Sequence, residues 1–284
     1  MKNYSIFLFM FIAISGYSQD LKAPKNVTPK KGEFFFTWGY NWSWFSNSNI
    51  RFEGDNYNFE LKSVKAADRP TPFTFENYFH PAYISTPQYN YRLGYFFSDH
   101  YSISIGVDHM KYIARPDQPV QIYGEIQNTG TIYDGVYNGE TVFLEEGFLE
   151  FEHTDGLNYV NVEVRRFDHL FTLHKNINMN LLYGSGIGVI YPRTNAVLLD
   201  NVRYDEFNLA GYGLHALFGV GFTFFKHLVV KTELKGGYIN MPNIRTTQNS
   251  SDSASQSFFF GQYNFSVGGS FNFLENKKEK NKNQ

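Results

Sequence analysis

The chain contains no cysteine among its 284 residues, so disulfide bonds, thiol chemistry and a lipoprotein anchor are all excluded. It also lacks an excess of basic charge: the net charge of −2 gives no field for binding nucleic acid. After the first residues, no apolar run approaches the roughly 20 residues that a membrane-spanning helix needs. A closed β-barrel is therefore the remaining way for this chain to be embedded in a membrane.

What is present at the N-terminus has the pattern of a secretory signal peptide. Lys2 supplies a positive charge, the segment 6–14 is apolar, and small residues flank Tyr17. We expect residues 1–18 to be removed after export, with cleavage near Ser18. Residues 19–32 are then a polar periplasmic leader, and the basic residues 274–284 form a disordered tail.

The segment Phe207–Tyr238 carries two residue sets that alternate with a period of two. One set is bulky and apolar, whereas the other consists mainly of glycine and charged residues, and Lys226-His227 forms a short polar break. Such a run, with aromatic residues near its ends, is typical of transmembrane β-barrel strands. Similar alternation begins at Glu33 and recurs in several runs. These are 33–42, 89–97, 101–108, 159–165, 177–191 and 257–273.

The lengths of the connections predict the strand count. Three are tight (98–100, 174–176 and 225–227) and four are long (43–88, 114–156, 192–206 and 241–256), and the two kinds alternate. Outer-membrane barrels have short periplasmic turns and long external loops. The sequence therefore predicts an all-β fold: a transmembrane antiparallel up-and-down β-barrel of about eight strands within residues 33–273, with both chain ends in the periplasm.

The long loops contain further alternation at 51–61, 120–126 and 142–152. We expect these segments to extend the barrel wall above the membrane as exposed hairpins. A barrel of ten to twelve strands, which would use them as spanning strands, is the alternative. Loop aromatic residues either form a contact surface for glycan or protein or belong to the outer aromatic girdle. They are Trp42, Trp44, Phe45, Phe52, Tyr57 and Phe59.

Three stretches resemble small OmpA/OmpX-type outer-membrane barrels, and most closely the outer-membrane β-barrel proteins of unassigned role in Bacteroidetes-like bacteria. They are FEGDNYNFELKSVKAADRP (52–70), PQYNYRLGYFFSDHYSISIGVDHMKY (87–112) and LNYVNVEVRRFD (157–168). The resemblance implies a barrel in the outer membrane of a Gram-negative bacterium, in contact with its lipid and lipopolysaccharide. It brings no catalytic motif.

Charged residues at inward-facing positions predict an ion-pair network in the lumen, because an eight-stranded barrel is just wide enough to be filled by side chains. Unpaired buried charges are costly, so Arg92 should pair with Asp108, and Glu163 or Glu233 with Arg165 or Lys231. A narrow solute path lined by charge is the alternative. The predicted set is Arg92, Asp108, Glu163, Arg165, His215, Lys231, Glu233 and Lys235.

His109 and Lys111 are predicted to face lipid at headgroup height. An outward histidine there resembles that of the lipid A deacylases, whose histidine is followed two residues later by the nucleophilic serine. Here that position is Lys111, which cannot supply a hydroxyl, so we expect no catalytic residues and no enzyme activity. His109 and Lys111 are instead predicted to contact lipopolysaccharide, with Lys111 near its phosphates.

Acidic loop residues are candidate ligands for a divalent cation, but they lack EF-hand spacing, and solvated loop charge is the preferred interpretation. They are Asp55, Asp68, Glu145, Glu146, Glu150 and Glu152. We therefore expect no metal and no cofactor. The sequence favours a monomeric barrel, inserted by the barrel-assembly machinery, with a structural or surface-interaction role through its extracellular loops. The alternative is a narrow channel for small or hydrophobic solutes; a lipid A-modifying enzyme is the third option.

Overall fold

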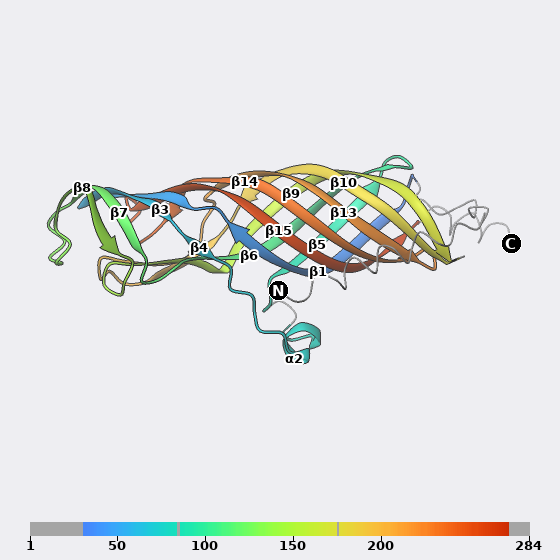
Figure 1. Ribbon diagram of the computed structural model, residues 1–284, viewed down its shortest axis with the longest axis horizontal. Helices are drawn as coiled ribbons and strands as arrows, with labels where there is room; N and C mark the ends of the chain where they lie inside the picture. The colour runs from blue at the N-terminus through green and yellow to red at the C-terminus, as the bar shows by residue number, and fades with distance from the viewer. Residues whose placement is uncertain (1–30, 84–85, 175, 273–284) are drawn as a thin grey trace, which may run out of the picture.

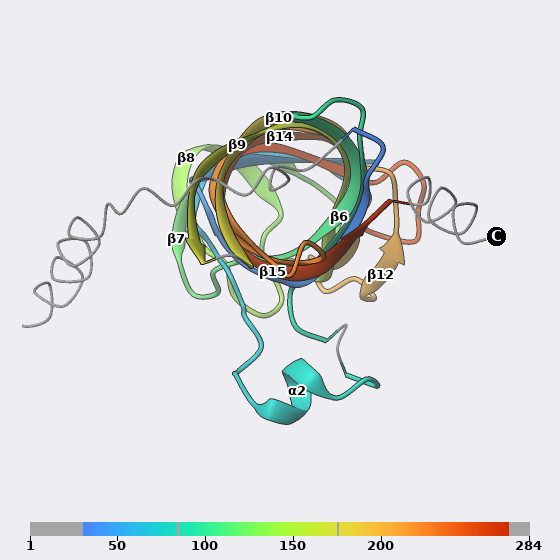
Figure 2. The same ribbon diagram turned by 90° about the vertical axis from the view of Figure 1, so that its right-hand side faces the viewer.

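Eight long antiparallel strands close into a ring (Figures 1 and 2). The computed structural model describes residues 31–83, 86–174 and 176–272. The predicted eight-stranded transmembrane barrel is thus confirmed. The ring follows the order β1 (Phe34–Phe45), β5 (Tyr89–Phe96), β6 (Tyr101–Ala114), β9 (Leu149–His174), β10 (Ile177–Ile190), β13 (Gly211–Phe224), β14 (Leu228–Arg245) and β15 (Ser253–Phe271).

The first and last strands of the ring pair with each other along their length, from Phe34 opposite Phe271 to Phe45 opposite Phe260. This pairing leaves the ring without a free edge, as a sheet surrounded by lipid requires. Among the described residues, no helix is long and apolar enough to cross a bilayer. The predicted signal peptide, most of the leader, Phe273 and the tail 274–284 lie outside the described residues.

The outer wall of the ring is apolar, as the period-two alternation predicts. On β1, Phe34 and Phe36 are exposed while Phe35 and Thr37 point inward. On β6, Ile103 and Ile105 are exposed while Ser102 and Ser104 are buried. Exposed apolar side chains continue around the wall and form a lipid-facing belt; further members include Leu93, Val162, Val164, Ile187, Leu214, Phe218, Leu234, Phe265 and Val267.

Several strand boundaries differ from the prediction. β14 continues to Arg245 and β15 begins at Ser253, both inside the predicted connection 241–256, and β9 begins at Leu149, inside the predicted connection 114–156. The hairpin that the sequence places at Phe207–Tyr238 begins its first spanning strand at Gly211, and Phe207 ends β12 (Tyr204–Phe207). The backbone bends between these strands, where the Asn208 N–H donates to Pro192 O (3.1 Å) and the Ala210 N–H to Ile190 O (3.0 Å). Ala210 is consequently buried and does not share the outward face of Tyr212 and Leu214.

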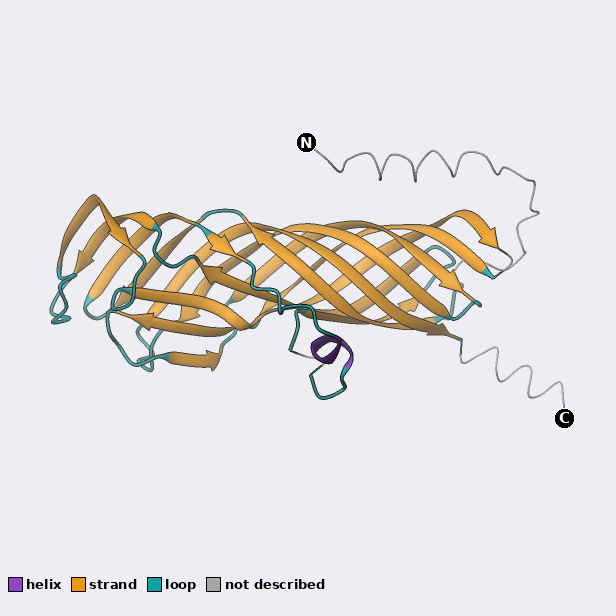
Figure 3. Cartoon of the chain, turned by 60° about the horizontal axis from the view of Figure 1, so that its bottom comes forward, coloured by secondary structure: helices purple, strands orange, loops and turns teal. Residues whose placement is uncertain are grey.

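Beyond one end of the ring, the sheet continues into a second region that we call the crown (Figures 1 and 3). The opposite end carries the short connections between spanning strands, and we call it the turn end. None of the crown's additional strands belongs to the ring, so the alternative of ten to twelve spanning strands is wrong. β2 (Ser48–Gly54), β3 (Tyr57–Val64), β7 (Pro119–Ile126) and β8 (Gly135–Phe143) follow β15 in order, β11 (Arg193–Leu198) and β12 pair beside β9, and β4 (Ala66–Ala67) pairs with β6.

The crown encloses a hydrophobic core, which the prediction of exposed hairpins did not include. Phe52 and Phe59 are buried and stack at 5.1 Å between ring centroids, and Tyr57 is buried beside them, so these three aromatics cannot form a contact surface. Trp42 and Trp44 stay exposed on the wall. The predicted segment 142–152 is the end of β8 and the start of β9. The core also includes Ile50, Leu61, Tyr112, Ile122, Phe148, Phe151, Ile239, Met241 and Phe258.

A short helix lies outside the ring, on the connection between β4 and β5 (Figures 2 and 3). This helix, α2 (Phe75–Phe79), begins at the cap residue Thr74, whose hydroxyl accepts the N–H of Asn77 (3.0 Å). Such a cap satisfies one of the free N–H groups at a helix start. The helix buries Tyr78 against the barrel and leaves its phenylalanines exposed.

Candidate functional site

Charged side chains form a connected layer across the lumen, with Glu163 at its centre. The Glu163 carboxylate accepts hydrogen bonds from Arg165 Nε (2.5 Å), Lys235 Nζ (2.9 Å) and His215 Nε2 (2.9 Å). Arg92 Nη2 lies 2.9 Å from the same carboxylate. Glu163 is fully buried, so the four surrounding donors are what stabilise its charge.

Two further carboxylates complete the layer. Asp108 accepts from Lys235 Nζ (2.5 Å) and lies 3.7 Å from Arg92 Nη2. Glu233 contacts Arg165 Nη1 (2.5 Å) and Lys231 Nζ (3.0 Å). The structure therefore brings all eight sequence-predicted lumen residues into one cluster, and each of them is buried. They come from five ring strands, β5, β6, β9, β13 and β14, so the contacts tie opposite sides of the ring together.

His215 joins this charged layer to the crown core. Its Nε2 lies against Glu163, which can only accept, and its Nδ1 lies 2.8 Å from the Tyr159 hydroxyl. A neutral ring with the proton on Nε2 satisfies both contacts, since Tyr159 then donates to Nδ1. Tyr159 belongs to the apolar core, where it meets Phe260 edge-on at 6.1 Å.

Along the long strands, the kind of residue on the inward face changes with its level in the barrel. Within the charged layer, Ser104 and Ser266 pair in register with Glu163 and Lys231, and their hydroxyls have no hydrogen-bond partner among the described residues. Nearer the turn end the buried inward residues are mixed: Asn178 and Ser270 are polar, whereas Phe35 and Phe96 pack on each other at 5.4 Å. On the crown side, the lumen is filled by the apolar core. A solute crossing the barrel would have to displace both the ion-paired layer and that core.

In the structure, the side chains of His109 and Lys111 contact other protein groups, whereas the sequence predicts that they face lipid. Only 8% of His109 is exposed, because its ring stacks on Tyr89 at 4.7 Å and its Nδ1 lies 2.8 Å from Asn158 Oδ1. Lys111 Nζ donates to Thr71 Oγ1 (3.3 Å) and Thr86 O (3.2 Å). These contacts hold the connection that carries α2 and leave His109 little surface for lipopolysaccharide.

The acidic loop residues do not converge on a metal site. Within residues 31–83, 86–174 and 176–272, no group of three or more His, Cys, Asp or Glu side chains is arranged to hold a metal ion. Asp68 accepts the Ser43 N–H (2.8 Å), and burial raises the pKa of its carboxyl. Glu152 lies 3.4 Å from Arg69, and Glu145 accepts the Tyr133 hydroxyl (3.2 Å). These carboxylates therefore have structural partners.

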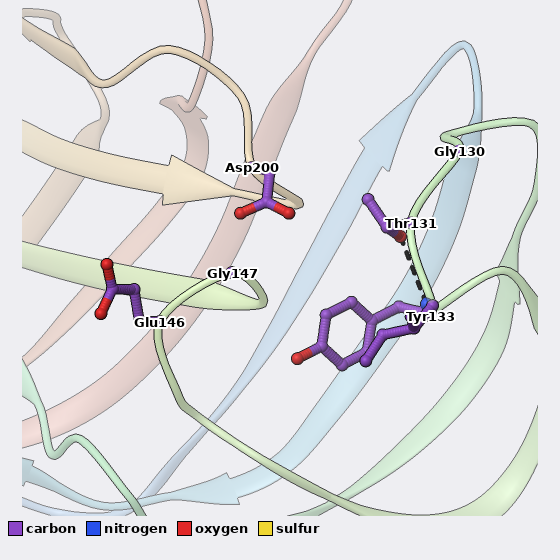
Figure 4. A pocket seen from close by; sticks show the side chains of 7 residues that line it. Gly130, Thr131, Tyr133, Glu146, Gly147 and Asp200 are labelled. Carbon is purple, nitrogen blue, oxygen red and sulfur yellow. Dashed lines mark hydrogen bonds between the residues drawn. The ribbon is translucent and has the colours of Figure 1, made fainter.

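Two surface features stand at the far tip of the crown. One is an open depression of about 410 Å³ between the β7–β8 turn and the connections that precede β9 and follow β11 (Figure 4). Its labelled polar side chains are Thr131, Tyr133, Glu146 and Asp200. The other feature is β8, which pairs only with β7 within the described part of the chain and so presents an open sheet edge.

The outward face of β8 carries apolar side chains at this edge. Val136 and Phe143 are both exposed, and they pair with Glu125 and Pro119 of β7. A register shift after Ile122, with Gly139 at φ +108°, keeps both residues on one face although they are an odd number of positions apart. Nothing in the sequence marks which loop strand lies at the edge, because that depends on pairing between distant segments.

Comparisons with known proteins give structural likenesses only. No family model matches the chain. No curated protein matches it either. Among solved structures, it is similar to the attachment invasion locus protein Ail of Yersinia pestis (12% identity, TM-score 0.33, 85% of this chain and 99% of that one). It is also similar to OprG of Pseudomonas aeruginosa (10%, TM-score 0.42, 87% and 99%) and to Neisserial surface protein A (9%, TM-score 0.30, 82% and 96%). The predicted resemblance to Bacteroidetes proteins stays a prediction.

Proposed function

We propose that this protein is an outer-membrane barrel that holds a rigid interaction surface outside the cell and does not conduct solutes. The observation that carries the proposal is the filled interior: an ion-paired layer around Glu163 lies directly beneath the apolar core of the crown. The lipid-facing belt and the closed eight-stranded ring support an outer-membrane location, because barrels of this kind are built for that membrane.

The interaction surface is the outer face and free edge of the crown sheet. An open edge presents unpaired backbone N–H and C=O groups, to which an extended segment of another polypeptide can add as a further strand. On β8 the exposed Val136 and Phe143 would give such a partner apolar contacts. The crown core holds this edge in a fixed geometry, so binding would cost little ordering of the barrel itself.

The first test is single-channel recording in planar bilayers. A filled lumen predicts no steady open conductance from the purified full-length protein. A reproducible open level would contradict the closed interior and would favour the rival role, a narrow channel for small solutes. The buried hydroxyls of Ser104 and Ser266, which have no partner among the described residues, are the observation that supports this rival.

The second test measures capture of bacteria carrying the protein on surfaces coated with a panel of glycans and polypeptides. The double substitution Val136→Lys with Phe143→Lys places charge along the β8 edge. We expect it to lower capture on the recognised coating by about tenfold, which corresponds to ~1.4 kcal/mol. Ile132→Lys, on the neighbouring turn, is the matched control because Ile132 is exposed but lies off the edge. Equal capture by both variants and the parent would refute the edge as the binding surface.

A further inference from the structure

We propose that residues 71–83, which we call the aromatic loop, insert into the outer leaflet of the membrane beside the barrel and anchor it there. This role is separate from the crown's interaction surface. Lipid is the single occupant that the proposal assigns to the loop's exposed face.

The aromatic loop exposes large apolar side chains with almost no charge among them. Phe73 is 72% exposed, Phe75 77% and Phe79 57%. Phe75 and Phe79 stack on each other at 4.7 Å between ring centroids, which makes one continuous apolar surface. Glu76 is the only acidic residue of the loop, and the loop contains no lysine or arginine. Apolar patches of this kind mark contact with a partner or with a membrane.

The loop is fixed to the barrel wall by specific contacts. The Tyr40 hydroxyl on β1 donates to Tyr78 O (2.5 Å), and the two rings meet edge-to-face at 4.7 Å. Tyr78 in turn donates to Thr71 O (2.9 Å), and Lys111 binds Thr71 from the wall. Tyr78 is buried by these contacts. The helix α2 is therefore held with Tyr78 toward the barrel and the phenylalanines exposed.

The level of the attachment lies within the lipid-facing belt. Tyr40 precedes Trp44 by four positions on β1, and Trp44 is exposed farther toward the crown. On β15, Phe259 lies two positions beyond Gly261, the partner of Trp44, and is exposed as well. Four residues of a strand tilted by about 40° correspond to roughly 10 Å along the barrel axis. Figures 1 and 3 show α2 beside the ring and well away from β7 and β8. The exposed phenylalanines thus lie where lipid already surrounds the wall, and a soluble partner would first have to displace that lipid.

The test uses a spin label, which the absence of cysteine makes straightforward. Phe75→Cys carries a nitroxide in the full-length protein in phospholipid nanodiscs, and its collisions with oxygen and with a water-soluble nickel chelate are compared. Leu93→Cys, on the lipid-facing wall, and Ile132→Cys, at the crown tip, are the membrane and water references. We expect the label at position 75 to favour oxygen over nickel by at least fivefold relative to the label at position 132.

The proposal would be overturned if the label at position 75 were as accessible to nickel as the label at position 132. It would also be overturned if the label at position 75 kept its preference for oxygen after the loop is released from the barrel wall. Release is achieved with Tyr78→Ala, which removes the ring that packs on Tyr40. In that background we expect the label at position 75 to lose much of its oxygen preference while the label at position 93 keeps its own. Heat-shifted gel mobility of every variant confirms that the barrel has folded. Neither result depends on the crown binding a ligand or on the lumen being closed.

Discussion

The spanning barrel and the crown are built from the same continuous strands, but they bury opposite kinds of side chain. On β14, the inward residues Lys231, Glu233 and Lys235 lie in the barrel, whereas Ile239 and Met241 on the same face lie in the crown core. On the inward face of β15, Asn264 and Gln262 likewise lie in the barrel, whereas Phe260 and Phe258 lie in the crown core. The outer face changes in the opposite sense, from the apolar belt to the mixed polar surface of β7 and β8.

The difference shows that the surrounding medium decides which side of the sheet is apolar. In lipid, apolar side chains gain nothing from turning inward, and the lumen can be polar as long as its charges are paired. In water, the same sheet must bury its apolar residues to be stable. The contact between His215 and Tyr159 lies at the level where the polar lumen meets the apolar core of the crown.

Removing the central carboxylate should have the largest effect. Glu163→Leu leaves Arg92, Arg165 and Lys235 with fewer buried partners, and breaking a buried ion pair costs about 3–5 kcal/mol. The free energy of unfolding in lipid vesicles, followed by tryptophan fluorescence in urea, should fall by that amount. Glu60→Gln, which breaks the partly exposed contact with Lys62 (2.5 Å) in the crown, should cost less than ~1 kcal/mol. Equal losses would mean that the lumen charges are not interdependent.

Truncation of a crown leucine should have the next largest effect. Leu61 is fully buried, so Leu61→Ala leaves a cavity and should destabilise the crown by about 3 kcal/mol. Hydrogen exchange of the β2 and β3 amides measures this loss. Leu234→Ala on the lipid-facing wall should cost less, because lipid chains can fill the space that it leaves. A larger loss at Leu234 would contradict the comparison.

A lysine on each outer face compares the two surrounding media directly. Ile105→Lys places a charge in the lipid-facing belt and should cost about 2–3 kcal/mol of folding free energy in vesicles. Val136→Lys places the same charge on the exposed face of β8 and should change the folding free energy by no more than about 0.5 kcal/mol. If Val136→Lys were as costly as Ile105→Lys, the crown surface would have to be embedded too.

The smallest expected effect is a pH dependence confined to the crown. His153 is fully buried, its Nδ1 lies 3.1 Å from Thr194 Oγ1, and burial lowers the pKa of its imidazole to about 3. The unfolded crown takes up this proton below pH ~6.5, whereas the folded crown does not. Stability is therefore fully present above pH ~6.5 and is lost as the pH falls from there toward 3, by about 2 kcal/mol at pH 5.

Hydrogen exchange of the β9 and β11 amides at pH 7.5 and pH 5, corrected for intrinsic rates, measures this dependence. His153→Gln should remove the part of it that comes from the imidazole. Persistence of the full dependence in that variant would assign it to other groups.

The spanning part of the fold could be predicted from the sequence because its information is local. Alternation around Leu93, Ile105 or Leu234 identifies the lipid-facing side, and the strict sequence of short and long connections gives the strand count. The side chains that meet in the lumen follow from the same parity, since every inward charge of a narrow barrel must find a partner within a few ångströms. The alternation itself does not show that four donors gather on Glu163.

The crown could not be predicted in the same way, because its pairing joins distant segments. β2 lies between β15 and β3, and β3 pairs with β7, so residues near 50, 60, 122 and 255 become neighbours. Alternation in each segment is equally compatible with an exposed hairpin or with one side of a core. The one local signal is on the inward face of the long strands, where Lys235 is followed by Ile239 and Met241.

The unbroken passage of β14 and β15 from the turn end into the crown also has a mechanical consequence. The two strands stay paired from Leu228 opposite Gly269 to Arg245 opposite Ser253, with one irregularity near Met241. A force applied along the axis at the crown would load this pairing in shear, with many backbone hydrogen bonds sharing the load at once. A tether attached at this surface would pull on the whole wall of the barrel, and there would be no flexible neck to yield first.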